Sequence, residues 1–426
     1  MKGIATQPYK GARDFYPQDM RVENYIFSIW KQVCSSFGFE EYSFPIIEPY
    51  EIFASKTGEE IVTEQLYSFE DKGGRKLAIR PEITPGTVRM IAQKYKELPQ
   101  PIKWFMVGNN WRFEKPQTGR GREFYQLEAN IFGESGIEAD LEIFRLIIAI
   151  MSAFGAREDM YQIKVSDRRL VNCLLSNVLK VDPIKQMQVR KLMDKRQKLT
   201  PEDFRKGLED ASLTGDQIDQ IGVFMSSELE RLNIPRDDPG YVSLLKLFDY
   251  LKELNMTSFV KFDPSIIRGF DYSDGLVYEV FDSKPDNRRS LFGGERFDRL
   301  INIFGDYELP STGFAMGDYT LLEFLKGWKL LPALENKIDY LVTVWPSNDT
   351  KYLLKSLDVA EKLRKDGSTV LCWTEPNTKL DKQLKYADKK GAKKVIILGE
   401  QELGSNTMTV KDMQTGSQES KALPSS

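Results

Sequence analysis

The stretch Trp104–Gly133 (WFMVGNNWRFEKPQTGRGREFYQLEANIFG) constrains the fold of this chain most strongly. Its two ends, Trp104–Phe113 and Phe124–Phe132, are rich in aromatic and branched residues, which favours strands. Between them, Lys115–Gly121 combines proline and glycine with basic residues, the composition of a turn. The sequence therefore predicts an antiparallel hairpin with a long, positively charged loop.

Alternation of side chains along these strands gathers polar residues on one face of the hairpin. It places Arg112 with Glu114 and aligns five residues around the second strand: Arg122, Phe124, Gln126, Glu128 and Asn130. The opposite face carries residues suited to a core: Tyr125, Leu127, Ala129 and Ile131. The guanidinium groups could bind phosphate, Phe124 could stack on a base and Glu114 could accept from an amino group. On this pattern alone, a nucleotide site and a solvated hairpin face are both open.

Length and net charge limit the number of domains and the kinds of partner that the chain can have. A chain of 426 residues with 41% hydrophobic content can bury a large core and is expected to form two or three domains. Its formal net charge of −3 argues against a uniformly basic nucleic-acid binder, so any RNA contact must depend on local patches.

The reactive residues narrow the chemistry further. Three widely spaced cysteines, Cys34, Cys173 and Cys372, suit a reducing cytoplasm and form no CxxC pair, which argues against zinc. The chain has no histidine, so any mechanism must do without the commonest general base and metal ligand. We expect no signal peptide or membrane span, because the most apolar run, Leu146–Met151, is too short to cross a bilayer.

The remaining segments indicate the order of the elements. Apolar residues at helical spacing predict a helix over 22–37, and the segment 39–49 reads as a strand. A hairpin is expected at 66–80, a helix at 138–154, mainly helices over about 168–255, and sheet again from 259. From 339 onwards strands and helices alternate, which indicates a small α/β domain with a mostly parallel sheet.

Several motifs occur in one order along the chain. They are KGARDFYP, IRPEITPGTVR, WRFEKPQTGRGREFYQLE, IIRGFDY, LFGGERFDRL, GFAMG and, near the end, KLDKQLKYADKKGAKKVIILGE. The third resembles motif 2 of the class II aminoacyl-tRNA synthetases, and nearly the whole chain resembles the histidyl-tRNA synthetase family. The resemblance implies an α+β fold: a class II antiparallel sheet flanked by helices, a helical insertion and a C-terminal α/β anticodon-binding domain.

The implied domains are a catalytic domain over 1–325 with the insertion at about 168–255, a linker over 326–337, and the anticodon-binding domain over 338–426. The implied activity is ATP-dependent activation of histidine followed by transfer to the 3′ end of tRNA. ATP is the implied substrate, Mg²⁺ is implied with it, and the helix–strand–proline element that runs into Pro45 implies a homodimer. The insertion would lie against the tRNA acceptor arm, and the C-terminal lysines Lys379, Lys382, Lys385, Lys389 and Lys390 would face the anticodon stem.

The resemblance also assigns roles to individual residues. Arg112 and Arg268 would stabilise charge at the α-phosphate, with Arg268 also near the carboxylate of the amino acid. ATP would be held by Arg112, Glu114, Phe124, Arg120 and Arg122. The α-amino group would be held by Glu82, Thr84 and Gln126. Tyr272, Asn130, Ser273 and Glu295 would line the amino-acid pocket.

The chain departs from the family pattern in four places. Most members have an arginine in motif 3 that binds the γ-phosphate, whereas this chain reads Gly317-Asp318-Tyr319-Thr320. We hypothesise that Arg288 or Arg289 supplies the missing charge. The family usually has an acidic residue at Asn130, a tyrosine at Ser273 and a glycine at Glu295.

The three pocket changes allow two interpretations. In the first, the carboxylate has moved from position 130 to Glu295, and Ser273 makes room for it, so that histidine is still selected. In the second, the pocket fits another side chain or none.

Two non-catalytic alternatives follow. The chain could be a regulatory paralogue, such as the regulatory subunit of the first enzyme of histidine biosynthesis, but the segment 338–426 argues against this. It could also be a tRNA-binding or sensing module without adenylation.

Overall fold

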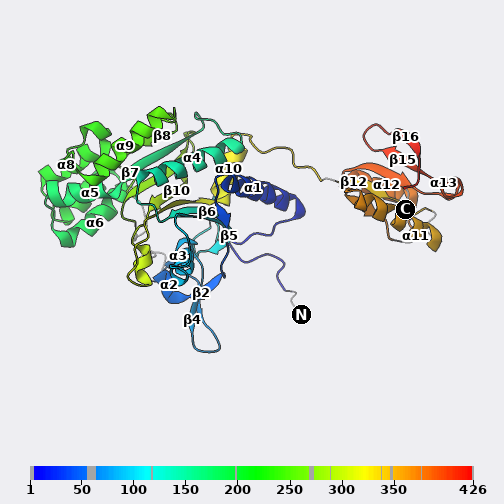
Figure 1. Cartoon of the computed structure of the whole chain (residues 1–426), viewed down its shortest axis with the longest axis horizontal. Coiled ribbons are helices and arrows are strands. Elements are labelled where there is room, and N and C mark those ends of the chain that lie inside the picture. Colours follow the sequence, from blue (N-terminus) through cyan, green and yellow to red (C-terminus); the bar gives the residue numbers. More distant parts are fainter. Residues whose placement is uncertain are drawn as a thin grey trace. The chain divides into compact units, whose positions relative to one another are not determined.

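The computed structural model describes residues 4–54, 64–116, 119–196, 199–267, 273–287, 289–336, 338–345, 349–375 and 377–424. The chain divides into two units, Met1–Leu331 and Pro332–Ser426 (Figure 1). The division falls inside the segment predicted as a linker, and helix α10 (Asp318–Gly327) reaches into the start of that segment.

An eight-stranded sheet forms the centre of the larger unit (Figure 1). In spatial order its strands are β1 (Glu40–Glu41), β5 (Ile102–Trp111), β6 (Glu123–Phe132), β11 (Ser311–Gly317), β10 (Ser290–Arg296), β9 (Leu276–Asp282), β7 (Tyr161–Asp167) and β8 (Val260–Phe262). The six central strands are antiparallel, and only the edge strands β1 and β8 pair in parallel. The predicted α+β class with an antiparallel sheet is confirmed.

Helices α1 (Pro17–Ser36), α4 (Ile137–Ala153) and α10 share a hydrophobic core with one face of this sheet. Their largest members, Trp30, Phe144 and Phe324, are fully buried. The face of β6 predicted to enter the core does so, because Leu127, Ala129 and Ile131 have no exposed surface. The opposite face of β6, with the polar side chains, is thereby left for a site.

The predicted hairpin is confirmed, with its ends shifted. Strands β5 and β6 pair without a break from Ile102–Phe132 to Trp111–Glu123. Beyond Trp111 the regular ladder ends, because the amide of Phe113 donates to the carbonyl of Gln65 at 2.7 Å instead. Arg112 therefore follows the strand, contrary to the prediction that the strand reaches Phe113, although its amide still donates to the carbonyl of Arg122 at 2.9 Å.

A second, three-stranded sheet lies beside the C-terminal end of β5, where the amide of Trp111 donates to the carbonyl of Arg80 at 3.0 Å. Its order is β2 (Ile47–Pro49), β4 (Lys76–Ile79) and β3 (Ser68–Glu70), with helices α2 (Tyr50–Ala54) and α3 (Thr84–Gln93) following β2 and β4. The expected hairpin between β3 and β4 is present, and its turn is closed by the Asp71 carboxylate, which accepts from the amide of Gly73 at 2.8 Å. Thr84 is the first residue of α3, and Glu82 lies two residues before it.

The segment after β7 is helical, as predicted. It contains α5 (Arg168–Cys173), a π-helix (Leu174–Val178), α6 (Pro183–Asp194), α7 (Pro201–Asp210), α8 (Gly215–Ser226), a 3₁₀ turn (Leu229–Arg231) and α9 (Pro239–Glu253). Capping side chains start these helices: Asp182, Thr200, Thr214 and Asp238 each accept from an amide of the first turn.

The smaller unit has a five-stranded sheet ordered β13 (Val370–Cys372), β12 (Ile338–Val342), β14 (Ala392–Ile397), β15 (Thr407–Asp412) and β16 (Gln418–Ala422). Helices α11 (Thr350–Lys365), α12 (Leu380–Lys390) and α13 (Glu400–Ser405) complete it. Only β13, β12 and β14 are parallel. The prediction of a mostly parallel sheet missed the antiparallel hairpin β15–β16, whose polar second strand gives no apolar alternation.

A buried ion pair joins α4 to the central strands. Arg296 of β10 donates to the Asp140 carboxylate, with Nη2 at 2.5 Å, and also to the carbonyl of Gly136 at 2.9 Å. The hydroxyl of Thr312 on β11 donates to the other oxygen of Asp140 at 2.6 Å. Asp140 is fully buried and Arg296 is 5% exposed. The ion pair and the Thr312 hydroxyl therefore link α4, β10 and β11. Because water does not reach the buried charges, loss of one partner is not compensated by hydration.

We expect Arg296→Met to lower the free energy of unfolding by about 3–5 kcal/mol, because it leaves the Asp140 charge buried without its partner. Urea unfolding measures the change. The matched control is Arg157→Met, which breaks an ion pair with Asp159 in which both side chains are at least 60% exposed, and it should change little. Equal effects of the two substitutions would contradict this assignment.

Candidate functional site

The ladder of the large sheet places the predicted site residues in rows. Asn130 on β6 pairs with Gly313 on β11, and Gly313 pairs in turn with Glu295 on β10. Residues that pair directly in this way project from the same face of a sheet. Asn130 and Glu295, two of the three altered pocket positions, therefore stand on either side of a glycine.

The next row repeats this arrangement. Glu128 pairs with Ala315, Ala315 with Gly293, and Gly293 with Glu279 on β9. A Cβ atom on Gly313 would lie 1.8 Å from Oδ1 of Asn130, and one on Gly293 would lie 2.6 Å from the carbonyl of Tyr278. Glycine is therefore required at both positions. Carboxylate and amide side chains thus border a strip of the smallest residues, where the backbone can approach a ligand.

Glu128 connects two sets of predicted contacts. Its Oε2 accepts from the hydroxyl of Thr84 at 3.0 Å, and its Oε1 accepts from the amide of Asn130 at 2.9 Å. Thr84 was predicted to bind the α-amino group and Asn130 to line the side-chain pocket, so one carboxyl group ties the two together. Burial raises the pKa of Glu128 to about 8, and the nearby charge of Glu82 contributes to the rise.

The sequence aligns Glu128 with the polar face of the hairpin but assigns it no role in the site. Its alternation with Gln126 and Asn130 was the available signal. Its contact with Thr84 was not visible, because Thr84 lies 44 positions away and reaches it only through the start of α3. Glu279 was also missed, since only the pairing of β9 with β10 brings it into the row.

Gln126 is held from the neighbouring strand. Nδ2 of Asn110 on β5 donates to Oε1 of Gln126 at 2.6 Å, and Asn110 is fully buried. Oδ1 of Asn110 is buried and has no hydrogen-bond partner among the residues that the structure describes. The side chain of Gln126 is therefore fixed in one orientation on the polar face, as a ligand contact requires.

Ser273, the third altered position, contacts Glu295. The hydroxyl of Ser273 donates to the carboxylate of Glu295. Ser273 is 7% exposed and precedes β9 in the chain, whereas Glu295 is half-buried on β10. Asn130, Ser273 and Glu295 are thus gathered in one place, although they belong to three separate segments of the chain.

The cationic side of the site lies where the hairpin strands end. Nε of Arg112 donates to the carbonyl of Pro81 at 2.8 Å, and its guanidinium carbon lies 5.3 Å from the centre of the Phe124 ring. Arg112 and Phe124, predicted to bind one nucleotide, are therefore neighbours. The carbonyl contact also brings Arg112 next to the segment that carries Glu82.

Glu114, Arg120 and Arg122 surround the hairpin loop. Nε of Arg120 lies 2.7 Å from Oε2 of Glu114, which is 9% exposed. Arg122 donates to the carbonyl of Glu114 at 3.1 Å and to the hydroxyl of Tyr9 at 2.5 Å. The N-terminal segment therefore contacts Arg122 directly, a contact that the sequence did not indicate.

In the segment Gly317-Asp318-Tyr319-Thr320, which lacks the motif 3 arginine, Asp318 forms an internal ion pair. The carboxylate of Asp318 accepts from the amide of Tyr125 at 3.0 Å and pairs with Arg13. The guanidinium of Arg13 lies 3.6 Å from the centre of the Tyr319 ring. Because Tyr125 projects towards α1 on the core side, Arg13 lies on the face opposite Gln126 and Glu128. Arg13 therefore does not replace the arginine of motif 3.

Three predicted residues, Arg268, Tyr272 and Arg288, lie outside the described residues. Arg289 is exposed at the start of β10. Among the residues that the structure describes, no group of three or more acidic or cysteine side chains is placed to hold a metal ion. The described helices include none with the length and apolar character needed to span a membrane.

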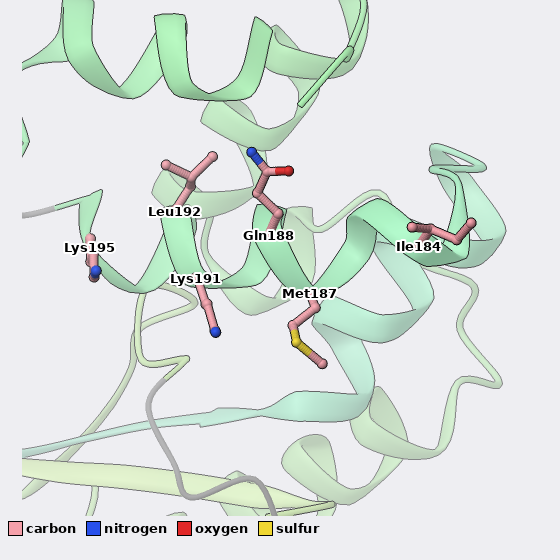
Figure 2. Close-up of a pocket in the computed structure, with 6 residues that line it drawn as sticks. All are labelled: Ile184, Met187, Gln188, Lys191, Leu192 and Lys195. Carbon is pink, nitrogen blue, oxygen red and sulfur yellow. The ribbon is translucent and has the colours of Figure 1, made fainter. Parts of the chain in front are cut away.

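Two further surfaces, one on each unit, carry lysines. On α6, Lys191 and Lys195 border a shallow surface pocket with Ile184 and Met187, which are 88% and 61% exposed (Figure 2). In the smaller unit, α12 carries Lys382 and Lys385, paired with Glu375 and Asp381, and its Tyr386 ring lies edge-on to Trp373 at 5.3 Å.

Comparisons with known proteins agree along the whole chain. A family described as histidyl-tRNA synthetase matches residues 11–320, and an anticodon binding domain matches residues 341–424. A histidine–tRNA ligase of Leptospira biflexa is 40% identical, covering 97% of this chain and 95% of the relative. The chloroplastic/mitochondrial histidine–tRNA ligase of Arabidopsis thaliana is 33% identical, covering 98% and 85%.

Solved structures show the same fold at lower identity. Histidyl-tRNA synthetase from Nostoc sp. PCC 7120 superposes with a TM-score of 0.79 at 20% identity, covering 99% of this chain and 97% of the other. A protein from Bacillus halodurans described as an ATP phosphoribosyltransferase regulatory subunit/histidyl-tRNA synthetase gives 0.76 at 19% identity, covering 93% and 99%.

Proposed function

The chain belongs to the histidyl-tRNA synthetase family, and we propose that it activates histidine with ATP and transfers the histidyl group to the 3′ end of a tRNA. In the first step a carboxylate oxygen of histidine bonds to the α-phosphorus as the bond to pyrophosphate breaks. In the second, the terminal ribose hydroxyl of the tRNA attacks the carbonyl carbon, loses its proton and releases AMP. The observation that carries the proposal is the convergence of Arg112, Phe124 and the Glu82–Thr84 segment on one end of the polar rows.

Different residues of the site would bind different parts of histidine and ATP. Glu82, Thr84 and Gln126 would bind the α-ammonium group of histidine, and Phe124 would stack on the adenine. Arg112, with Arg268, would stabilise the charge that develops on the α-phosphate. Activation requires alignment and charge stabilisation but no proton shuttle, so a chain without histidine can perform it.

Magnesium would be brought by ATP. The described residues form no cage of acidic ligands, and Mg²⁺ typically keeps several waters and binds through substrate phosphates with one or two carboxylates. Glu114, 9% exposed and paired with Arg120 beside the hairpin loop, is one carboxylate that could take part.

We further propose a cytoplasmic homodimer. Ile47 on β2, Phe69 on β3 and Phe113 after β5 are large apolar side chains with 42–50% of their surface exposed. A second copy could cover them. A mass in solution near the 49.1 kDa of one chain would contradict the dimer.

Two non-catalytic functions are weaker candidates. The fold is similar to that of a protein described in part as a regulatory subunit. However, residues 341–424 match an anticodon binding domain, which favours a tRNA ligand. A tRNA-sensing module would account for the altered pocket and the missing motif 3 arginine. It would not account for the placement of Arg112 beside Phe124.

Alanine at Arg112 should reduce histidine-dependent pyrophosphate exchange by about 10²–10³-fold, since a cation at the developing charge is lost. Of Arg288→Ala and Arg289→Ala, one should weaken ATP use severely if it replaces the motif 3 arginine. The control is Arg75→Ala, at a 78% exposed side chain on the β3–β4 turn. Near-normal exchange in all three test variants would reject the ATP site.

The altered pocket is tested with Glu295→Gly and Glu295→Gln. If Glu295 has taken over the role of an acid at position 130, both variants lose exchange with histidine, because the paired polar contact disappears. Exchange with each of the twenty amino acids shows which one the wild-type protein selects. A rise in histidine activity in Glu295→Gly would contradict the relocation.

Contact of α6 with the tRNA is tested by replacing Lys191 and Lys195 together with alanine. Loss of two cations that neutralise phosphates should raise KM for tRNA and weaken its dependence on salt, while pyrophosphate exchange stays unchanged. The control replaces Lys246, which pairs with Glu138 on another face at 2.6 Å. An unchanged KM for tRNA in the double variant would exclude this surface.

A further inference from the structure

We propose that Glu128 is a positioning residue that couples the α-amino subsite to the side-chain subsite, and that its charge sets the affinity for the amino acid. This inference rests on the proposed activation of an amino acid in this site. It concerns a carboxyl group to which the family resemblance assigned no role.

The geometry makes Glu128 the link between the two subsites. Its Oε2 accepts from the hydroxyl of Thr84 at 3.0 Å and its Oε1 from the amide of Asn130 at 2.9 Å, and the backbone of Thr84 adds a further hydrogen bond. Since the Thr84 hydroxyl donates to Glu128, its lone pairs face other donors, which is what an ammonium group needs. Asn130 is fixed in the same way, with its amide NH₂ towards Glu128 and Gly313 beside it.

The surroundings of Glu128 favour a neutral carboxyl in the empty site. It is 2% exposed, and its partners across the sheet, Met106 on β5 and Ala315 on β11, carry no charge. From the start of α3, Glu82 adds a like charge and Thr84 a hydroxyl. Among the described residues, Tyr42 in the segment after β1 and Arg80 in the segment after β4 also interact electrostatically with its charge. Burial outweighs the hydrogen bonds, so the pKa of Glu128 rises to about 8.

Binding of an ammonium group shifts Glu128 from the neutral to the ionised form. A cation held by Glu82 and Thr84 lies next to the carboxyl of Glu128 and favours its ionised form. Binding then releases a proton from Glu128, so affinity for the amino acid rises with pH up to the pKa of the empty site. If only the ionised form binds, KM falls up to about eightfold between pH 7 and 8.5.

The test compares wild type, Glu128→Gln and Glu128→Asp in pyrophosphate exchange between pH 7 and 8.5. Glutamine has the same shape and cannot ionise, so KM for the amino acid should be independent of pH in Glu128→Gln, with KM for ATP unchanged. Aspartate keeps the ionisable group, so Glu128→Asp should keep a fall in KM. Thermal unfolding of each variant checks that it folds.

A matched control is Glu23→Gln. Glu23 on α1 is also a buried carboxyl, with its pKa raised to about 7 by burial and by Asp318, but it lies on the core face of the sheet. Its loss should leave the pH dependence of KM as in wild type. Calorimetry of amino-acid binding in two buffers of different ionisation enthalpy counts the released protons without using activity. We expect release by wild type and none from position 128 in Glu128→Gln.

The outcomes separate the two proposals. A wild-type protein that catalyses exchange with a pH-independent KM, or a Glu128→Gln variant with the wild-type pH profile, overturns the role of Glu128 and leaves the activity intact. A wild-type protein that catalyses no exchange with any amino acid overturns the proposed function. Proton release on histidine binding, lost in Glu128→Gln, would then still support the coupling.

Discussion

The register of the antiparallel ladder between β6, β11 and β10 is the constraint on which the rest of the site depends. It puts Gly313 between Asn130 and Glu295, and Ala315 beside Glu128. A shift of one residue in either pairing would turn these polar side chains into the core. The buried Asp140–Arg296 pair, reinforced by Thr312, ties β10 and β11 to α4 and so helps to hold that register.

This arrangement explains how three changes at distant positions can be compatible with one pocket. Asn130, Ser273 and Glu295, the positions that we expect to differ from the usual family residues, are gathered by the fold around one glycine, and Ser273 hydrogen-bonds to Glu295. The carboxylate of Glu295 remains available to the side chain of a bound amino acid, although it lies on β10 and not on β6. Glu128 adds a second acidic group, whose neutral form in the empty site limits repulsion between neighbouring carboxylates.

The sequence predicts the features that neighbouring residues determine and misses those that depend on contacts between distant segments. The hairpin, its core face and the turn at Asp71 come from alternation and turn chemistry that act over a few residues, and the structure confirms them. The end of β5 at Trp111, the ion pair between Arg13 and Asp318, and the contact of Thr84 with Glu128 depend on segments brought together only by the tertiary fold. No local pattern specifies such contacts, and the polar strand β16 carries too little apolar alternation to be recognised.

The central claim is that one site holds ATP and an amino acid between the hairpin and the segment before α3. A crystal structure with a non-hydrolysable aminoacyl-adenylate analogue tests it most directly. The account predicts the adenine on Phe124, the phosphate between Arg112 and Arg268, and the ammonium group within hydrogen-bond distance of Glu82, Thr84 and Gln126. An analogue bound elsewhere, or Arg112 and Arg268 directed into separate regions, would contradict it.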